Sequence, residues 1–113
     1  MATILKERRK KIRLEQYNNA YDKLKKVGSF LYQEGAGKVY FFGSIINPDA
    51  WTEYSDIDIA VEGITEEKRV RVETDLGELL NGLEYDLIFL EDKEKIRKEI
   101  LDRIEKEAVL WKP

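Results

Sequence analysis

The chain contains neither cysteine nor histidine. The first absence excludes disulfides and thiolate nucleophiles, and the second excludes imidazole bases, imidazole zinc ligands and every histidine-dependent catalytic triad. Any chemistry must therefore use carboxylates, hydroxyls, amines, the backbone or a bound metal ion.

Long apolar runs are also absent. No stretch approaches the roughly 20 residues that cross a bilayer, and the N-terminus lacks the apolar segment of a signal peptide. We therefore expect a cytoplasmic protein. With 113 residues, 42% of them apolar, the chain can bury one core but not two, so residues 1–113 are expected to form a single domain.

The net charge of −3 is unevenly spread. Residues 1–34 hold nine basic and four acidic residues, whereas the rest of the chain holds eleven basic and nineteen acidic residues. A basic helix is therefore expected to precede an acidic body. Six of the basic residues lie close together: Lys6, Arg8, Arg9, Lys10, Lys11 and Arg13. Such a run is most often a solvated helix face, and its alternative role is to attract RNA or an acidic partner. Nucleic-acid binding is not expected, because no nucleic-acid motif accompanies the run.

The spacing of apolar residues predicts an α/β (α+β) fold, a small mixed β-sheet with flanking helices. Residues 1–34 form a helix with an apolar stripe, and residues 38–113 hold the sheet, the polar motifs and a C-terminal helix. Residues 38–42 are apolar on both faces, as expected for a central strand covered on both sides. The other predicted elements are a strand at 56–61, a helix at 65–80, a strand at 84–90 and a helix at 93–111.

Two aspartates open the second predicted strand. Because side chains alternate along a strand, Asp56 and Asp58 share one face while Ile57 and Ile59 point to the other. The two carboxylates then lie about 6 to 7 Å apart. Like charges held this close favour a shared cation, and their hard oxygen ligands suit Mg²⁺.

Further polar groups are predicted to meet this pair. Gly43 and Ser44 follow the first strand, and Asp86 lies in the apolar third strand, where an ionised carboxylate is costly without a partner. If the first two strands are antiparallel and the helix at 65–80 connects parallel strands, all these groups converge at one sheet edge. Three carboxylates around one or two Mg²⁺ ions, with Ser44 and backbone N–H groups on the terminal phosphates, indicate nucleotidyl transfer.

The motifs also resemble those of a known family. The succession Gly43-Ser44, Ser55-Asp56-Ile57-Asp58-Ile59 and Tyr85-Asp86-Leu87 resembles the GS…(S)DxD…D pattern of the polymerase-β-like nucleotidyltransferases. The small size and the element order resemble the minimal nucleotidyltransferases (MNT), many of which are antitoxins paired with HEPN-domain ribonuclease toxins. The resemblance covers nearly the whole chain and implies the palm-like nucleotidyltransferase fold.

The resemblance assigns roles to the motif residues. It implies that Asp56, Asp58 and Asp86 are catalytic and bind Mg²⁺ in a two-metal site, with Asp86 activating the acceptor hydroxyl. Gly43 and Ser44 would bind the triphosphate of the nucleotide. The resemblance to MntA-type antitoxins further implies ATP as substrate, a HEPN toxin as partner, and inactivation of that toxin by AMPylation of a tyrosine hydroxyl.

Departures from the family pattern leave other functions open. Ile45 stands where family members often have an arginine that grips phosphate, and the gap to the aspartates is slightly longer. The alternative is an antitoxin that neutralises its partner by contact, with a weak or inactive site. Transfer to a small molecule such as an aminoglycoside is a third possibility. Trp51 and Tyr54 either stack on a base or cover the sheet edge.

Overall fold

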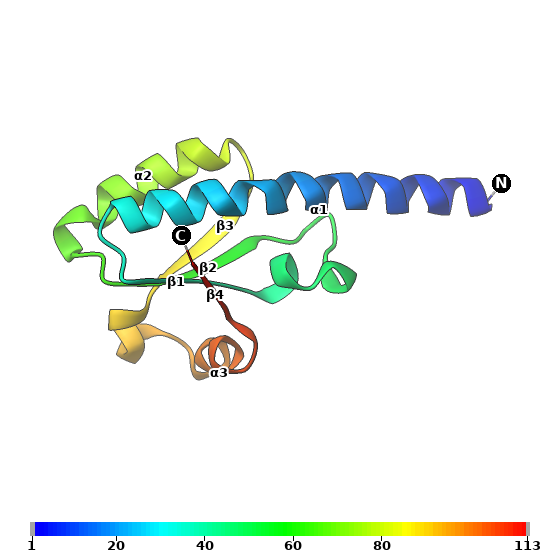
Figure 1. Cartoon of the computed structure of the whole chain (residues 1–113). Helices are drawn as coiled ribbons and strands as arrows, with labels where there is room; N and C mark the ends of the chain where they lie inside the picture. Colours follow the sequence, from blue (N-terminus) through cyan, green and yellow to red (C-terminus); the bar gives the residue numbers. More distant parts are fainter. Residues whose placement is uncertain (1, 113) are drawn as a thin grey trace.

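The computed structural model describes residues 2–112, which form a four-stranded sheet with helices on both faces (Figure 1). The helices are α1 (Ala2–Gln33), α2 (Arg69–Leu80) and α3 (Lys98–Glu107), and the strands are β1 (Lys38–Phe42), β2 (Ile57–Glu62), β3 (Tyr85–Phe89) and β4 (Val109–Trp111). Four short 3₁₀ segments connect them: η1 (Gly43–Ile46), η2 (Pro48–Ala50), η3 (Glu66–Lys68) and η4 (Leu90–Lys95). Within the described residues, no helix is long and apolar enough to span a membrane.

The sheet has the strand order β3-β2-β1-β4. Strand β1 is antiparallel to both β2 and β4, whereas β2 and β3 are parallel and are joined through α2. The prediction of a small mixed sheet with flanking helices is confirmed, including the central place of β1. Both relations that bring the polar motifs together, β1 antiparallel to β2 and β2 parallel to β3, are present.

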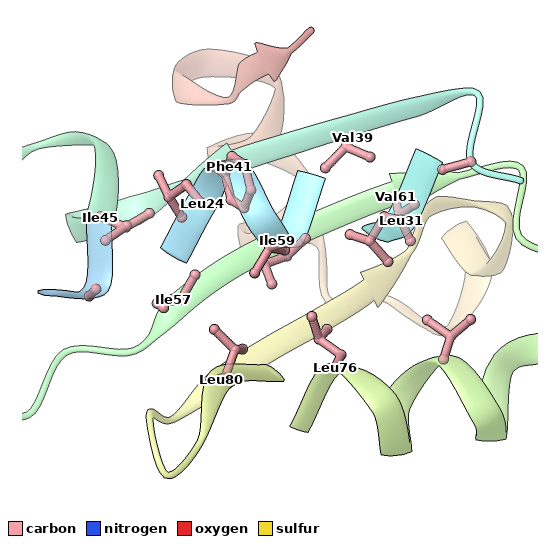
Figure 2. Packing of buried hydrophobic residues seen from close by; sticks show 14 of the residues in the cluster. Leu24, Leu31, Val39, Phe41, Ile45, Ile57, Ile59, Val61, Leu76 and Leu80 are labelled. Carbon is pink, nitrogen blue, oxygen red and sulfur yellow. The ribbon is translucent and has the colours of Figure 1, made fainter. Parts of the chain in front are cut away.

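The main core lies between the sheet and the pair α1 and α2. Alternate residues of β1 and β2, such as Phe41 and Ile59, point into it and are almost fully buried (Figure 2). They meet a stripe of α1 and α2 side chains that is equally buried: Leu24, Val27, Leu31, Val72, Leu76 and Leu80. Each such side chain contributes about 1.5–3 kcal/mol when it leaves water, so this layer stabilises most of the fold.

The opposite face of the sheet is covered only in part. Phe42, Ala60 and Leu90 are buried there, and Ile100 and Ile104 of α3 pack against them. This face carries the predicted aspartates, since they alternate with the core residues of β2.

The C-terminal end differs from the prediction of a helix over 93–111. Helix α3 ends at Glu107, and Val109–Trp111 form the strand β4 beside β1. The Trp111 ring packs edge-on against Phe41, with centroids 5.4 Å apart, and against Gly28 of α1. The Tyr32 hydroxyl donates a hydrogen bond to the Trp111 carbonyl. Strand pairing and the packing of the partly buried Trp111 therefore outweigh the helical spacing of the last apolar residues.

Helix α1 extends well beyond the sheet (Figure 1). Its 32 residues span about 48 Å at the rise of an α-helix. Only the C-terminal half lies on the core, and residues 4–16 are all exposed. The basic run predicted to be a helix face is therefore on the projecting half, as a solvated face would be.

Candidate active site

The predicted motif residues meet where β1 ends and where β2 and β3 begin. Phe42, the last residue of β1, is in register with Asp58 of β2. Asp58 is in turn in register with Asp86 of β3. Gly43 follows Phe42 directly, so the structure brings Gly43, Asp58 and Asp86 to one edge of the sheet, as the strand directions predicted.

Gly43 lies against the Asp58 carboxylate. Its φ of 76° is in the left-handed region, which favours glycine. A Cβ atom at this position would overlap Asp58 Oδ2. The Gly43 N–H donates a hydrogen bond of 3.2 Å to Glu107 Oε1 from α3. Glycine is therefore required here both by the backbone conformation and by the closeness of the carboxylate.

Asp58 has the most perturbed environment of the three aspartates. Its side chain is 18% exposed. Burial, followed by the negative charge of Asp86, raises the pKa of Asp58 to about 6, with smaller contributions in the same direction from Asp56 and Glu107. The Arg103 guanidinium opposes this shift. Asp58 is thus a carboxylate whose negative charge is only partly compensated by the protein, a common property of functional sites.

Asp56 lies one residue before β2 and belongs to a neighbouring pair. Its pKa is raised by burial and by Glu84, through charge repulsion and a side-chain hydrogen bond. Within residues 2–112, no group of three or more acidic side chains is arranged to hold a metal ion by itself. Among the described residues, the three aspartates therefore do not form a complete set of metal ligands.

The Asp58–Asp86 pair nevertheless fits a nucleotide-bound Mg²⁺ ion. Mg²⁺ is usually held by one or two carboxylates together with substrate phosphates and waters, rather than by a complete protein cage. Two adjacent carboxylates, one of them buried enough to raise its pKa, provide that donor set. Asp86 is exposed, so an incoming ligand can reach this side of the pair.

The residues after Gly43 continue into the core. Ser44 is half-buried, and Ile45 is fully buried in the main hydrophobic cluster. The Ile45 carbonyl accepts a hydrogen bond of 2.8 Å from the Tyr17 hydroxyl of α1. The residue that directly follows Ser44 thus belongs to the hydrophobic core of this protein.

The two aromatic candidates for base stacking have different surroundings. Trp51 is 5% exposed and packs edge-on against Tyr17, with centroids 5.6 Å apart. Tyr54 is 85% exposed. Trp51 is therefore a core side chain that covers the sheet edge, whereas Tyr54 remains accessible. Both border a cavity of about 480 Å³, together with Ser55 and Glu84.

Three charged residues at the site were not predicted. Arg103 Nη2 lies 4.0 Å from Asp58 Oδ2 and 3.3 Å from Glu107 Oε1. Glu84 adjoins Asp56. Glu84 could have been found, because it is two residues from Asp86 and so on the same strand face. Arg103 and Glu107 give no such signal, since they lie on the polar side of a helix rich in charge.

A sheet edge that presents paired carboxylates beside a glycine turn suits the class of proteins that transfer phosphoryl or nucleotidyl groups with the help of a metal ion. The family described as "Polymerase beta, Nucleotidyltransferase" matches residues 25–110, which include β1, β2, β3, α2, α3 and all of β4 except Trp111. The chain belongs to this nucleotidyltransferase family. No curated protein sequence matches it.

Solved structures with the same fold include toxin–antitoxin complexes. A chain of a mutant MntA–HpeT complex matches with a TM-score of 0.59 and 22% identity, covering 78% of this chain and 70% of that one. A toxin–antitoxin structure with AMP-PNP matches with a TM-score of 0.56 and 21% identity, covering 82% of this chain and 73% of that one. A complex of a tri-AMPylated Shewanella oneidensis HEPN toxin with MNT antitoxin matches with a TM-score of 0.54 and 21% identity. This match covers 80% of this chain and 71% of that one. At these identities the similarity establishes the fold.

Proposed function

We propose that this protein is a Mg²⁺-dependent nucleotidyltransferase that transfers an adenylyl group from ATP to a protein hydroxyl. The proposed acceptor is a HEPN-type toxin, which the protein would inactivate by AMPylation as its cytoplasmic antitoxin. The observation that carries this proposal is the register of Asp58 and Asp86 on adjacent strands, with Gly43 against the first of them.

The reaction assigns a separate task to each group. The acceptor oxygen attacks the α-phosphorus of ATP, a new P–O bond forms, the bond to the bridging oxygen of the β-phosphate breaks, and pyrophosphate leaves. Asp86, which is exposed, takes the proton of the acceptor hydroxyl. Asp58 and Asp86, with Asp56 beside them, would hold Mg²⁺, while Gly43 and Ser44 would position the terminal phosphates. A Mg²⁺ ion held by these carboxylates would neutralise phosphate charge and polarise the α-phosphorus.

The structural relatives support the choice of acceptor. One contains an AMPylated HEPN toxin together with an MNT antitoxin, and another contains AMP-PNP, an ATP analogue. Their fold is that of this chain, and their partners have the chemistry that our proposal requires, a nucleotide donor and a protein acceptor.

A second candidate is an antitoxin that acts by contact alone. Arg103 contacts Asp58, and Glu107 accepts the hydrogen bond of the Gly43 N–H, so groups that a nucleotide would use are already engaged within the protein. If a nucleotide does not displace these contacts, only binding to the partner remains. The two functions differ in whether neutralisation requires the aspartates.

Transfer of radioactive label from ATP labelled at the α-phosphate tests the proposal. The protein is incubated with Mg²⁺ and host lysate beside the variant Asp56→Asn/Asp58→Asn. A matched control, Asp22→Asn/Asp102→Asn, makes the same change of charge at two exposed aspartates away from the strand motif.

We expect a labelled protein band with the wild type and the control, and its loss with Asp56→Asn/Asp58→Asn. If the folded wild type labels no protein and binds no Mg·ATP, the contact-only function replaces the enzyme. A label that persists in the Asp56→Asn/Asp58→Asn variant would overturn the assignment of the site.

A further inference from the structure

One position at the site already holds an anion. The Glu107 carboxylate accepts the N–H of Gly43 at 3.2 Å and lies 3.3 Å from both Nε and Nη2 of Arg103. A backbone N–H and a guanidinium that converge on one oxygen are also the donors that bind phosphate oxygens. The carboxylate thus marks a place where a phosphate group would find the same partners.

We propose that Arg103 is a nucleotide-binding residue and that it binds a phosphate of the nucleotide at the position that the Glu107 carboxylate occupies. This inference rests on the proposed function, because it requires a nucleotide at the Asp58 edge. It assigns to α3 a part of the site that the strand motifs alone do not contain.

The guanidinium of Arg103 is held over the turn that starts at Gly43. Its central carbon lies 5.8 Å from the centroid of the Phe42 ring, and Nη2 lies 4.0 Å from Asp58 Oδ2. The side chain is 52% exposed, so it can contact a ligand without breaking a buried core. Its place is fixed on one side by the ring and on the other by the carboxylate.

The charge balance of the site favours such a cation. Asp56, Asp58, Asp86 and Glu107 all act on this edge of the sheet, and a triphosphate adds further negative charge. Ile45 is buried in the core and contributes no charge. A guanidinium offers two parallel N–H donors to a phosphate, a geometry that an ammonium group lacks. Arg103 therefore supplies from α3 the contact that the residue after Ser44 does not.

The contact with Glu107 gives the proposal a second consequence. A phosphate and the Glu107 carboxylate cannot accept from Gly43 and Arg103 in the same place, and they repel each other. Binding of nucleotide must therefore displace Glu107. Removing its charge should favour the nucleotide, whereas removing the charge of Arg103 should oppose it. The two neighbouring substitutions are thus expected to act in opposite directions.

Calorimetric titration with the Mg²⁺ complex of α,β-methylene-ATP tests this inference, because the methylene bridge blocks transfer. Wild type is compared with Arg103→Gln, Arg103→Lys, Glu107→Gln and the control Lys106→Gln, an exposed charge on the same helix. We expect Arg103→Gln to weaken binding about tenfold, as for a lost charged hydrogen bond, Arg103→Lys to restore part of it, and Glu107→Gln to tighten binding. Lys106→Gln should match wild type within about twofold.

The outcomes separate this inference from the proposed function. Wild-type affinity in Arg103→Gln, or weaker binding in both Arg103→Gln and Glu107→Gln, overturns the role of Arg103 while the enzyme stands. If the wild type binds no analogue and transfers no label, the proposed function fails and the role of Arg103 fails with it. Urea unfolding without nucleotide identifies a variant that is misfolded, and Arg103→Lys, which keeps the charge, then decides between the outcomes.

Discussion

The surroundings of Asp58 disfavour the ionised form of its side chain. Its folded pKa of about 6 lies above the ordinary value of 3.8, because burial and neighbouring carboxylates disfavour the charged form. The native state therefore binds the proton more tightly than the unfolded chain does. Stability from this group is fully present below about pH 4 and is lost as the pH rises through about 6.

The substitution Asp58→Asn should accordingly stabilise the metal-free protein at high pH. Asparagine cannot ionise, so we expect the free energy of unfolding to rise by about 2 kcal/mol near pH 8 and to change little near pH 4. Urea unfolding in EDTA at both pH values measures this difference. The exposed-site variant Asp22→Asn is the control at both pH values. An equal effect of Asp58→Asn at both pH values would contradict the argument.

Gly43 can be tested against a glycine that shares its conformation but not its surroundings. Gly43 and Gly82 both have positive φ, of 76° and 89°, but a Cβ on Gly82 has open space around it. Alanine at either position should cost about 1 kcal/mol of stability through the left-handed backbone. Only Gly43→Ala should also displace Asp58 and reduce label transfer at least about tenfold. Equal transfer by both variants would show that the contact with Asp58 is not needed.

Whether the sequence predicts the position of a single site residue depends on which interactions determine that position. Asp58, Asp86 and Gly43 follow from strand alternation and strand direction, which are local or topological properties. Arg103 and Glu107 depend on how α3 lies over the sheet, and that is decided by the packing of Ile100 and Ile104. The spacing of apolar residues predicts that one side of α3 packs on the sheet. It does not predict how close the polar side of α3 comes to Asp58.

At the scale of elements, β4 is the part that the pattern did not predict. Only three residues form it, and their apolar character extends the spacing of the preceding helix. What distinguishes them is a partner far away in sequence: Trp111 fits against Gly28, and Tyr32 bonds its carbonyl. The other strands could be predicted because each is bounded by turn residues and is followed or preceded by a polar motif.

Gly28 is therefore expected to respond to substitution unlike an ordinary helical glycine. A Cβ there would overlap the Trp111 ring, so Gly28→Ala should destabilise the protein by about 1–2 kcal/mol despite the better helix propensity of alanine. Gly77 of α2 has only Tyr85 Oη nearby, at 3.5 Å. Gly77→Ala should stabilise by about 0.5–1 kcal/mol. Urea unfolding measures both variants, and an increase in stability of Gly28→Ala like that expected for Gly77→Ala would refute this role of Gly28.

At the scale of the whole molecule, the projecting half of α1 carries a cluster of positive charge but contributes little to the hydrophobic core. Lys6, Arg9 and Arg13 line one groove together with Tyr54, beyond the core-forming part of the helix. Because residues 4–16 are exposed, the substitution of all three basic residues by glutamine should leave the free energy of unfolding unchanged within about 0.5 kcal/mol.

The same triple variant tests whether this groove attracts polyanions. We expect it to elute from heparin at clearly lower salt than wild type, because clustered charges create a stronger field than scattered ones. The control Lys93→Gln/Lys95→Gln/Lys98→Gln removes the same charge from exposed positions of the acidic body. Equal shifts for both variants would identify the basic run as an ordinary solvated face.

The pairing of β4 with β1 also has a consequence for biosynthesis. Residues 109–111 leave the ribosome after every other described strand, so β1 keeps an open edge until they arrive. An open edge of an apolar strand can hydrogen-bond to a strand of another nascent chain. A protein that stalls or is cleaved before Val109 would thus be prone to aggregate, because β1 would lack the pairing that β4 provides.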